Sequence, residues 1–153
     1  MIRVLFVCHG NICRSPMAEF ILKDMAERAH LADRFEIASA ATSYEEIGNP
    51  VYPPARRKLA EHGISCAGKR ARHLEKRDYR DYDLLIGMDR RNLVNMRREM
   101  GGDPDGKIHL LGEYCGLDRD IEDPWYSGDF EAAWRDIHAG CAGLMERLLK
   151  NGC

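Results

Sequence analysis

Apolar residues along this chain gather in four short runs, and in the segments between them they recur at the spacing of a helix. The runs have the length of strands, and the first is almost wholly apolar, as is typical of a strand buried on both faces of a parallel sheet. The predicted strands cover residues 2–7, 35–40, 83–88 and 107–111. The predicted helices cover residues 14–29, 55–62, 90–100 and 130–150. The longest predicted loops are residues 42–54 and 112–128.

This alternation of strands and helices predicts an α/β fold, in which a parallel sheet carries helices on both faces. The chain has 153 residues, and 44% of them are hydrophobic, which suffices for one substantial core. We find no internal repeat, no low-complexity tract and no shift of composition that would mark a linker. The sequence therefore predicts a single domain spanning residues 1–153.

Charge and cysteine content narrow the class of protein. A net charge of −2 argues against a general nucleic-acid binder, which would normally carry a strong basic surplus. No apolar run approaches the roughly 20 residues that span a bilayer, and the first run is too short for a signal peptide. The six cysteines include no Cys-x-x-Cys pair, which argues against a zinc site or a disulfide scaffold. We expect a cytoplasmic monomer with no metal or other cofactor and no nucleic-acid or membrane partner.

Basic residues accumulate between residues 69 and 77. They are Lys69, Arg70, Arg72, Lys76 and Arg77. Such a run is usually a solvated face, and this is the interpretation we adopt. A role in steering acidic substrates is the alternative.

Residues 7–16 read Val-Cys-His-Gly-Asn-Ile-Cys-Arg-Ser-Pro and join the first predicted strand to the first predicted helix. A loop this short turns successive backbone N–H groups inward, and the helix dipole adds positive potential, so that an oxyanion is favoured there. Arg14 adds a planar fork of donors suited to phosphate oxygens. The same field favours the thiolate form of Cys8 at the base of the loop. A thiolate beneath a phosphate is a nucleophile aimed at phosphorus.

The bland alternative is that Cys8 is a small buried hydrophobe, because Cys-x5-Arg also occurs by chance. The surrounding residues favour a catalytic role for Cys8 instead. Gly10 and Asn11 tolerate left-handed backbone, while Ser15 and Pro16 suit the start of a helix. The loop also follows the carboxyl end of a strand, where open α/β sheets bind ligands.

Cys13 lies five residues after Cys8 in this curled loop, so their sulfur atoms could approach each other. A reversible disulfide between them would protect the nucleophile from irreversible oxidation. The alternative is that Cys13 only packs beneath the loop.

Residues 4–19 closely resemble the N-terminus of the low-molecular-weight protein tyrosine phosphatases. The resemblance continues through residues 39–43, 47–50, 87–89 and 122–126, and so covers essentially the whole chain. It implies a flavodoxin-like three-layer sandwich whose four strands lie in the order 2-1-3-4. It also implies that the protein hydrolyses phosphotyrosine in proteins or peptides.

The resemblance assigns roles to individual residues. Cys8 would form a phosphocysteine, Arg14 would bind phosphate, and Asp123 would be the general acid and then the base. Taken from the residues alone, Asp118, Asp120 and Asp129 compete with Asp123 for that last role. The expected substrate-binding residues are His9, Gly10, Asn11, Ile12, Cys13, Ser15, Glu46, Trp125 and Tyr126. Ser39 is expected to support the loop through Asn11.

Three rival functions share the loop. Arsenate reductases need a relay of further cysteines, but none occurs between Cys66 and Cys115. Phosphoarginine phosphatases have a loop that resembles this one, but they carry threonine at the place of Ile12. A silent phosphate-binding module would need neither Cys8 nor Asp123.

Overall fold

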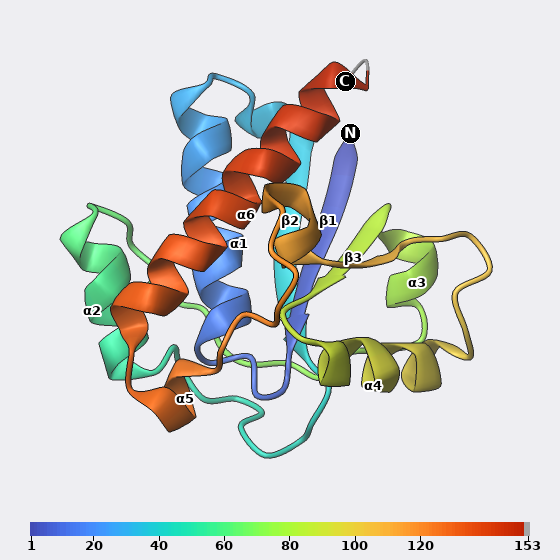
Figure 1. Ribbon diagram of the computed structural model, residues 1–153, viewed down its shortest axis with the longest axis horizontal. Coiled ribbons are helices and arrows are strands. Elements are labelled where there is room, and N and C mark those ends of the chain that lie inside the picture. The colour runs from blue at the N-terminus through green and yellow to red at the C-terminus, as the bar shows by residue number, and fades with distance from the viewer. Residues whose placement is uncertain (152–153) are drawn as a thin grey trace.

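In the computed structural model, which describes residues 1–151, a four-stranded sheet separates two layers of helices (Figure 1). All neighbouring strands are parallel, and their order is β2-β1-β3-β4, which confirms the implied order. The strands are β1 (Ile2–Cys8), β2 (Phe35–Ala41), β3 (Leu84–Gly87) and β4 (Ile108–Leu110). Their bounds lie close to the predicted runs, so the α/β prediction is confirmed.

The α1 and α6 helices pack against each other on one face of the sheet, with α2 beside them, while α4 covers the other face together with the short α3 (Figure 1). The helices are α1 (Arg14–Arg28), α2 (Pro53–Glu61), α3 (Asp78–Asp81), α4 (Arg90–Met100), α5 (Pro124–Ser127) and α6 (Phe130–Lys150). Two 3-10 helices are η1 (Ala32–Arg34) and η2 (Leu111–Cys115). Within residues 1–151, none of the helices is long and apolar enough to cross a membrane.

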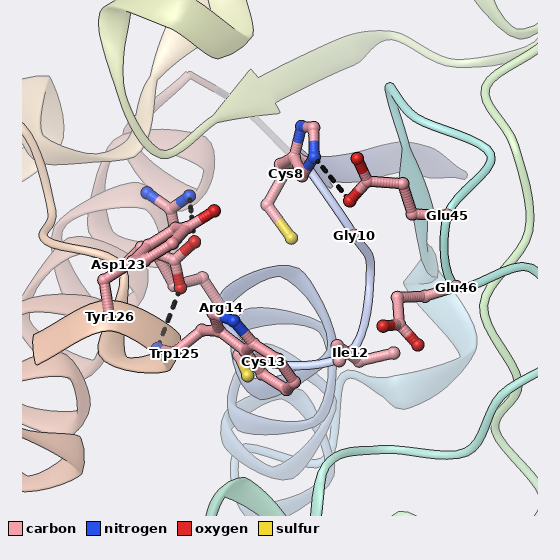
Figure 2. A pocket seen from close by; sticks show the side chains of 11 residues that line it. Cys8, Gly10, Ile12, Cys13, Arg14, Glu45, Glu46, Asp123, Trp125 and Tyr126 are labelled. Carbon is pink, nitrogen blue, oxygen red and sulfur yellow. Dashed lines mark hydrogen bonds and ion pairs between the residues drawn. The ribbon is translucent and has the colours of Figure 1, made fainter. Parts of the chain in front are cut away.

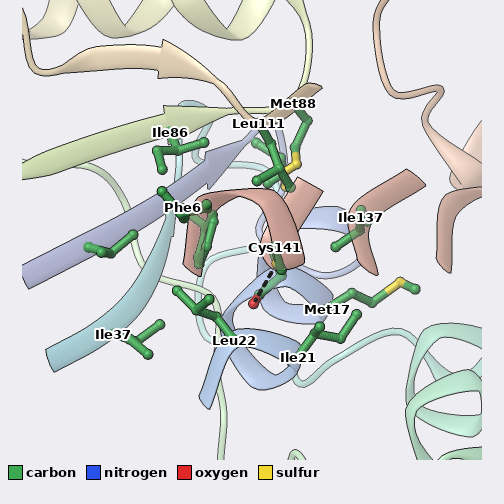
Figure 3. Packing of buried hydrophobic residues seen from close by; sticks show 14 of the residues in the cluster. Phe6, Met17, Ile21, Leu22, Ile37, Ile86, Met88, Leu111, Ile137 and Cys141 are labelled. Atoms are coloured by element: carbon green, nitrogen blue, oxygen red, sulfur yellow. Dashed lines mark hydrogen bonds between the residues drawn. The ribbon is translucent and has the colours of Figure 1, made fainter. Parts of the chain in front are cut away.

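The central strand β1 is buried on both faces, as its unbroken apolar run predicted. Val4 and Phe6 point into the cluster formed with α1 and α6, which Figure 3 shows around Phe6. Leu5 and Val7 alternate with them and enter the smaller cluster beneath α4. All four side chains are fully buried, and each contributes about 1.5–3 kcal/mol by leaving water.

The strand order places the 8–15 loop at the switch point of the sheet. The chain leaves β1 through α1 to reach β2, whereas β3 and α4 lead in the opposite direction to β4. A crevice therefore opens at the carboxyl ends of β1 and β3, and such crevices are where α/β sheets bind ligands.

The prediction of one long loop over residues 112–128 is wrong in part. This stretch contains most of η2 and the whole of α5. The α5 helix has four residues, too few to show a periodic pattern. Its local signals are a capping aspartate, Asp123, and Pro124 at the first helical position. The short helix α3 was missed for the same reason.

Two glycines of α6 allow η2 to pack closely against it. A Cβ atom at Gly143 would lie 2.0 Å from the carbonyl oxygen of Tyr114. A Cβ atom at Gly140 would lie 2.5 Å from Leu111 Cγ. The backbone of η2 thus occupies the space that a side chain would need, and this contact fixes where the segment after β4 begins.

We expect Gly143→Ala to lower the free energy of unfolding by about 1–3 kcal/mol, because the added methyl group meets backbone rather than a mobile side chain. Helix propensity alone predicts the opposite, a gain of about 1 kcal/mol. Urea denaturation of the variant and of an Ala142→Gly control on the exposed side of α6 measures both effects. A Gly143→Ala protein more stable than the parent by about 1 kcal/mol, the gain from helix propensity alone, would show that the contact does not restrict residue 143.

Candidate active site

The sulfur of Cys8 lies at the end of β1 and is held by two donors of the following loop. The backbone N–H of Asn11 donates to it over 3.3 Å, and the Ser15 hydroxyl lies 3.0 Å away. Asn11 adopts left-handed backbone with a φ of 58°, as the sequence predicted for this position. The sulfur therefore faces hydrogen-bond donors that favour a negative charge on it.

The direction of the buried hydrogen bonds around Asn11 follows from counting donors and acceptors. Its amide nitrogen donates to Ser15 Oγ over 2.7 Å and to Ser39 Oγ over 2.9 Å, so both amide hydrogens are used. The Ser39 hydroxyl donates in turn to Glu19 over 2.5 Å. Ser15 accepts from Asn11, which leaves its own hydrogen for the Cys8 sulfur. The hydrogen bond predicted between Asn11 and Ser39 is present.

Glu19 is a residue that sequence reasoning missed, although it follows Ser15 by one helical turn on α1. It is 4% exposed, and its carboxylate lies 2.6 Å from Lys23 Nζ and 3.3 Å from Lys69 Nζ. Burial lowers the pKa of Lys69, and the charge of Glu19 opposes this effect. The prediction that the basic run is a solvated face is therefore wrong for Lys69. Its ammonium group also donates to the Ser39 carbonyl oxygen over 3.0 Å.

The guanidinium of Arg14 is 2% exposed and joins three segments of the chain. Its Nη1 donates over 2.8 Å both to Asp89 Oδ2 and to the Ile121 carbonyl oxygen. Its Nη2 lies 3.5 Å from Asp123 Oδ2. Burial disfavours the charged form, but the neighbouring Cys8, Asp123 and Asp89 outweigh it and raise the pKa of Arg14. The site thus keeps a fixed positive charge.

Asp89 has two tasks at the start of α4. Its Oδ1 accepts the backbone N–H of Asn92 over 2.8 Å, which confirms the predicted N-cap. Its other oxygen holds Arg14. The sequence predicts the cap from local spacing, but it carries no signal for a partner 75 residues away.

Of the four competing aspartates, only Asp123 lines the cavity around Cys8. Its Oδ1 accepts the backbone N–H of Trp125 over 3.1 Å at the start of α5, and its Oδ2 faces Arg14. Asp120 accepts from the Arg90 backbone over 3.1 Å, and Asp129 caps α6. Asp118 is exposed.

The cavity has two unlike walls (Figure 2). The residues on one side are Asp123, Trp125 and Tyr126. Glu45 and Glu46 lie on the other side, with the Cys8 sulfur between the walls. The further lining residues are His9, Gly10, Ile12, Cys13 and Arg14.

Most of the predicted binding residues thus meet at one cavity. The exceptions are Asn11 and Ser15, whose side chains lie behind the loop in the buried network. Glu45 is an addition to the predicted set, and its Oε2 lies 3.1 Å from His9 Nε2.

Cys8 and Cys13 are both buried, at 3% and 4% exposed. Burial raises the pKa of Cys13, and the negative charges of Cys8 and Asp123 raise it further. Cys13 therefore stays a neutral thiol, and both cysteines are free. Cys153 lies outside the described residues. Among residues 1–151, no three potential ligands of the His, Cys, Asp or Glu type gather at a metal-binding distance.

Comparison with known proteins finds relatives and solved structures that match nearly the whole chain. The family model described as low molecular weight phosphotyrosine protein phosphatase matches residues 3–152. The low molecular weight protein-tyrosine-phosphatase YfkJ of Bacillus subtilis is 38% identical over 152 residues, which cover 98% of this chain and 97% of YfkJ. The crystal structure of YfkJ matches with a TM-score of 0.97, and the match covers 100% of this chain and 98% of that one.

Two further relatives show the breadth of the likeness. The low molecular weight phosphotyrosine protein phosphatase of Schizosaccharomyces pombe is 39% identical over 153 residues, covering 98% of this chain and 96% of the relative. The structure of DARP, a Drosophila arginine phosphatase, is 34% identical with a TM-score of 0.87 and covers 96% of this chain and 98% of that one. Because the family model matches nearly every residue, the chain belongs to the low molecular weight phosphotyrosine protein phosphatase family.

Proposed function

We propose that this protein hydrolyses phosphotyrosine in proteins or peptides through a phosphocysteine on Cys8. The observation that carries the proposal is that the Cys8 sulfur lies at a cavity which is also lined by Arg14 and by the carboxyl group of Asp123, two groups 3.5 Å apart. Family membership supports the same chemistry. We infer one catalytic domain, since the family model matches residues 3–152, whereas the cytoplasmic setting and the monomeric state stay predictions of the sequence.

In the first step, the sulfur of Cys8 attacks phosphorus and a sulfur–phosphorus bond forms. The bond between phosphorus and the tyrosyl oxygen breaks, and the leaving oxygen takes a proton from Asp123. Arg14 and the backbone N–H groups of the loop bind the remaining phosphate oxygens, where charge gathers in the transition state. Asp89 and the Ile121 carbonyl keep the guanidinium of Arg14 aimed at that position.

In the second step, water attacks phosphorus and gives a proton to the carboxylate of Asp123. The sulfur–phosphorus bond breaks, which releases phosphate and returns Cys8 to its starting state. The hydroxyl of Ser15 lies 3.0 Å from the sulfur and stabilises it as the leaving group. Both steps use only groups of this chain and water.

The aromatic wall supports phosphotyrosine as the substrate. Trp125 and Tyr126 offer flat apolar surface beside a sulfur that only a long side chain reaches. A phosphoserine side chain is too short to bring its phosphate to Cys8 while its backbone stays outside. Hydrolysis of phosphoarginine is the second candidate, favoured by the likeness to DARP. Ile12 opposes it, because the resemblance described above implies threonine at this place in phosphoarginine phosphatases.

Cys8→Ser should reduce phosphotyrosine hydrolysis by about a thousandfold or more, because a serine hydroxyl is not ionised in this site and makes a poor nucleophile. Inorganic phosphate should still bind, since Arg14 and the loop amides remain. Steady-state kinetics and phosphate titration calorimetry measure the two effects. A variant that keeps its turnover would remove Cys8 from the mechanism.

Asp123→Asn should slow hydrolysis of phosphotyrosine by about 10²–10⁴-fold, because the amide has no proton to give to the leaving oxygen. The loss should be smaller for 4-nitrophenyl phosphate, whose leaving group is stable without a proton. Asparagine can still cap α5, so the change tests chemistry rather than folding.

The matched control for this prediction is Asp129→Asn, a capping aspartate outside the cavity. Its ratio of kcat/KM for the two esters should equal that of the parent protein, because kcat/KM contains the first step, in which the two esters differ. If Asp123→Asn leaves that ratio unaltered, another group is the acid.

Iodoacetate at neutral pH should carboxymethylate Cys8 and spare Cys13. Burial raises the pKa of Cys13, so its reactive thiolate forms only in more alkaline solution. Peptide mass spectrometry identifies the labelled residue, and inorganic phosphate should protect it. Faster labelling of Cys13 would contradict the assignment of Cys8 as the reactive sulfur.

A further inference from the structure

A small apolar cluster lies beneath the 8–15 loop, apart from the two main cores. Its buried members are Ile12, Cys13 and Ala71, and Tyr52 and Phe130 pack against them. Tyr52 does not line the cavity, and the sequence gives no sign of a role for it within a proline-rich loop. Its contacts nevertheless join both halves of the site.

The backbone of Tyr52 is tied to the phosphate-binding side. Its N–H donates to the Ile12 carbonyl oxygen over 2.9 Å, so it is fixed to the 8–15 loop. It also precedes Pro53, which restricts its backbone to the extended conformation seen, with a ψ of 134°. The start of α2 then leads the chain away from the site.

The ring of Tyr52 is tied to the opposite wall. Its centroid lies 4.6 Å from that of Trp125, with the planes tilted by 54°, and 6.1 Å from that of Phe130. Tilted rings at this distance attract each other beyond the effect of buried area. Tyr52 therefore bridges the 8–15 loop and the aromatic wall.

The same contact reaches the carboxyl group of Asp123. The backbone N–H of Trp125 donates to Asp123 Oδ1, so the place of Trp125 decides the orientation of that side chain. The α5 helix that carries Trp125 has four residues, far fewer than a helix needs to be stable alone. Packing from outside must hold it, and Tyr52 supplies such packing.

We propose that Tyr52 is a positioning residue, which holds Trp125 and Asp123 at a fixed distance from the phosphate-binding loop. This inference rests on the proposed function. It adds that proton donation to the tyrosyl oxygen depends on a residue that touches neither substrate nor reacting atoms. Such a residue should affect esters with poor leaving groups most, because they need the proton.

The experiment compares Tyr52→Ala with Tyr52→Phe, which keeps the ring and removes only the hydroxyl. The matched control is Tyr44→Ala in the same loop. Tyr44 stacks on His73 at 3.8 Å and does not line the cavity. All proteins carry Trp134→Phe, so that Trp125 is the sole tryptophan of the two in the sequence.

Two readouts are measured for each protein. The first is the ratio of kcat/KM for phosphotyrosine to that for 4-nitrophenyl phosphate. We expect Tyr52→Ala to lower it about two- to tenfold, the range that one aromatic pair accounts for. The second is quenching of Trp125 fluorescence by acrylamide, which should increase. Tyr52→Phe and Tyr44→Ala should leave both readouts as in the parent.

An unchanged ratio in a folded Tyr52→Ala protein overturns the proposal, whether or not Trp125 becomes easier to quench. If Tyr52→Ala does not fold, Tyr52→Leu, which keeps apolar volume without the flat ring, decides in its place. A parent protein that hydrolyses neither ester overturns the proposed function itself. An active parent with an unaffected Tyr52→Ala variant overturns only the role of Tyr52.

Discussion

The buried guanidinium of Arg14 is the constraint on which the rest of the site depends. A charge that is 2% exposed would cost several kcal/mol if it had no partners. Its partners come from the start of α4 and from the 116–129 segment, through Asp89, Ile121 and Asp123. Three segments distant in sequence must therefore meet at one point, so the folded chain carries a fixed positive charge beside Cys8 before any substrate arrives.

A buried hydrogen-bond network behind the 8–15 loop is the second constraint on the site. Glu19 can only accept hydrogen bonds as a carboxylate, so the Ser39 hydroxyl must donate to it. The amide of Asn11 then donates to Ser39 and Ser15, and the Ser15 hydrogen is left for the sulfur. Because these groups are buried, reversing one bond would leave a polar atom unsatisfied. The charge of Glu19 thus fixes a proton arrangement that ends at Cys8.

Sequence patterns predicted those parts of the fold that are long or contiguous. The four strands appear as contiguous apolar runs, the longer helices have periodic patterns, and residues 8–15 form one uninterrupted motif. The patterns failed for the short helices α3, α5, η1 and η2, because helices of three to five residues show no period.

Contacts between residues far apart in the chain could also not be predicted from the sequence. Lys69 with Glu19, and Tyr52 with Trp125, meet only through the packing of separate elements. The sequence alone did not decide among the four aspartates. The structure does, because three of them lie outside the cavity. Two of these three accept backbone N–H groups at the starts of helices. Local pattern therefore points to the proposed nucleophile, while tertiary placement points to the proposed acid.

This difference has a consequence for how the site can vary. Cys8 is fixed by a central strand, paired on both sides and buried on both faces. Asp123 is held by the backbone N–H of Trp125 and by the guanidinium of Arg14, and the ring of Tyr52 packs on Trp125. Because misplacement by about 1 Å can cost 10²-fold in rate, side-chain changes around the 116–129 segment can alter proton delivery and substrate choice. Such substitutions leave the sheet and the proposed nucleophile Cys8 in place, so specificity can change separately from the bond-making step.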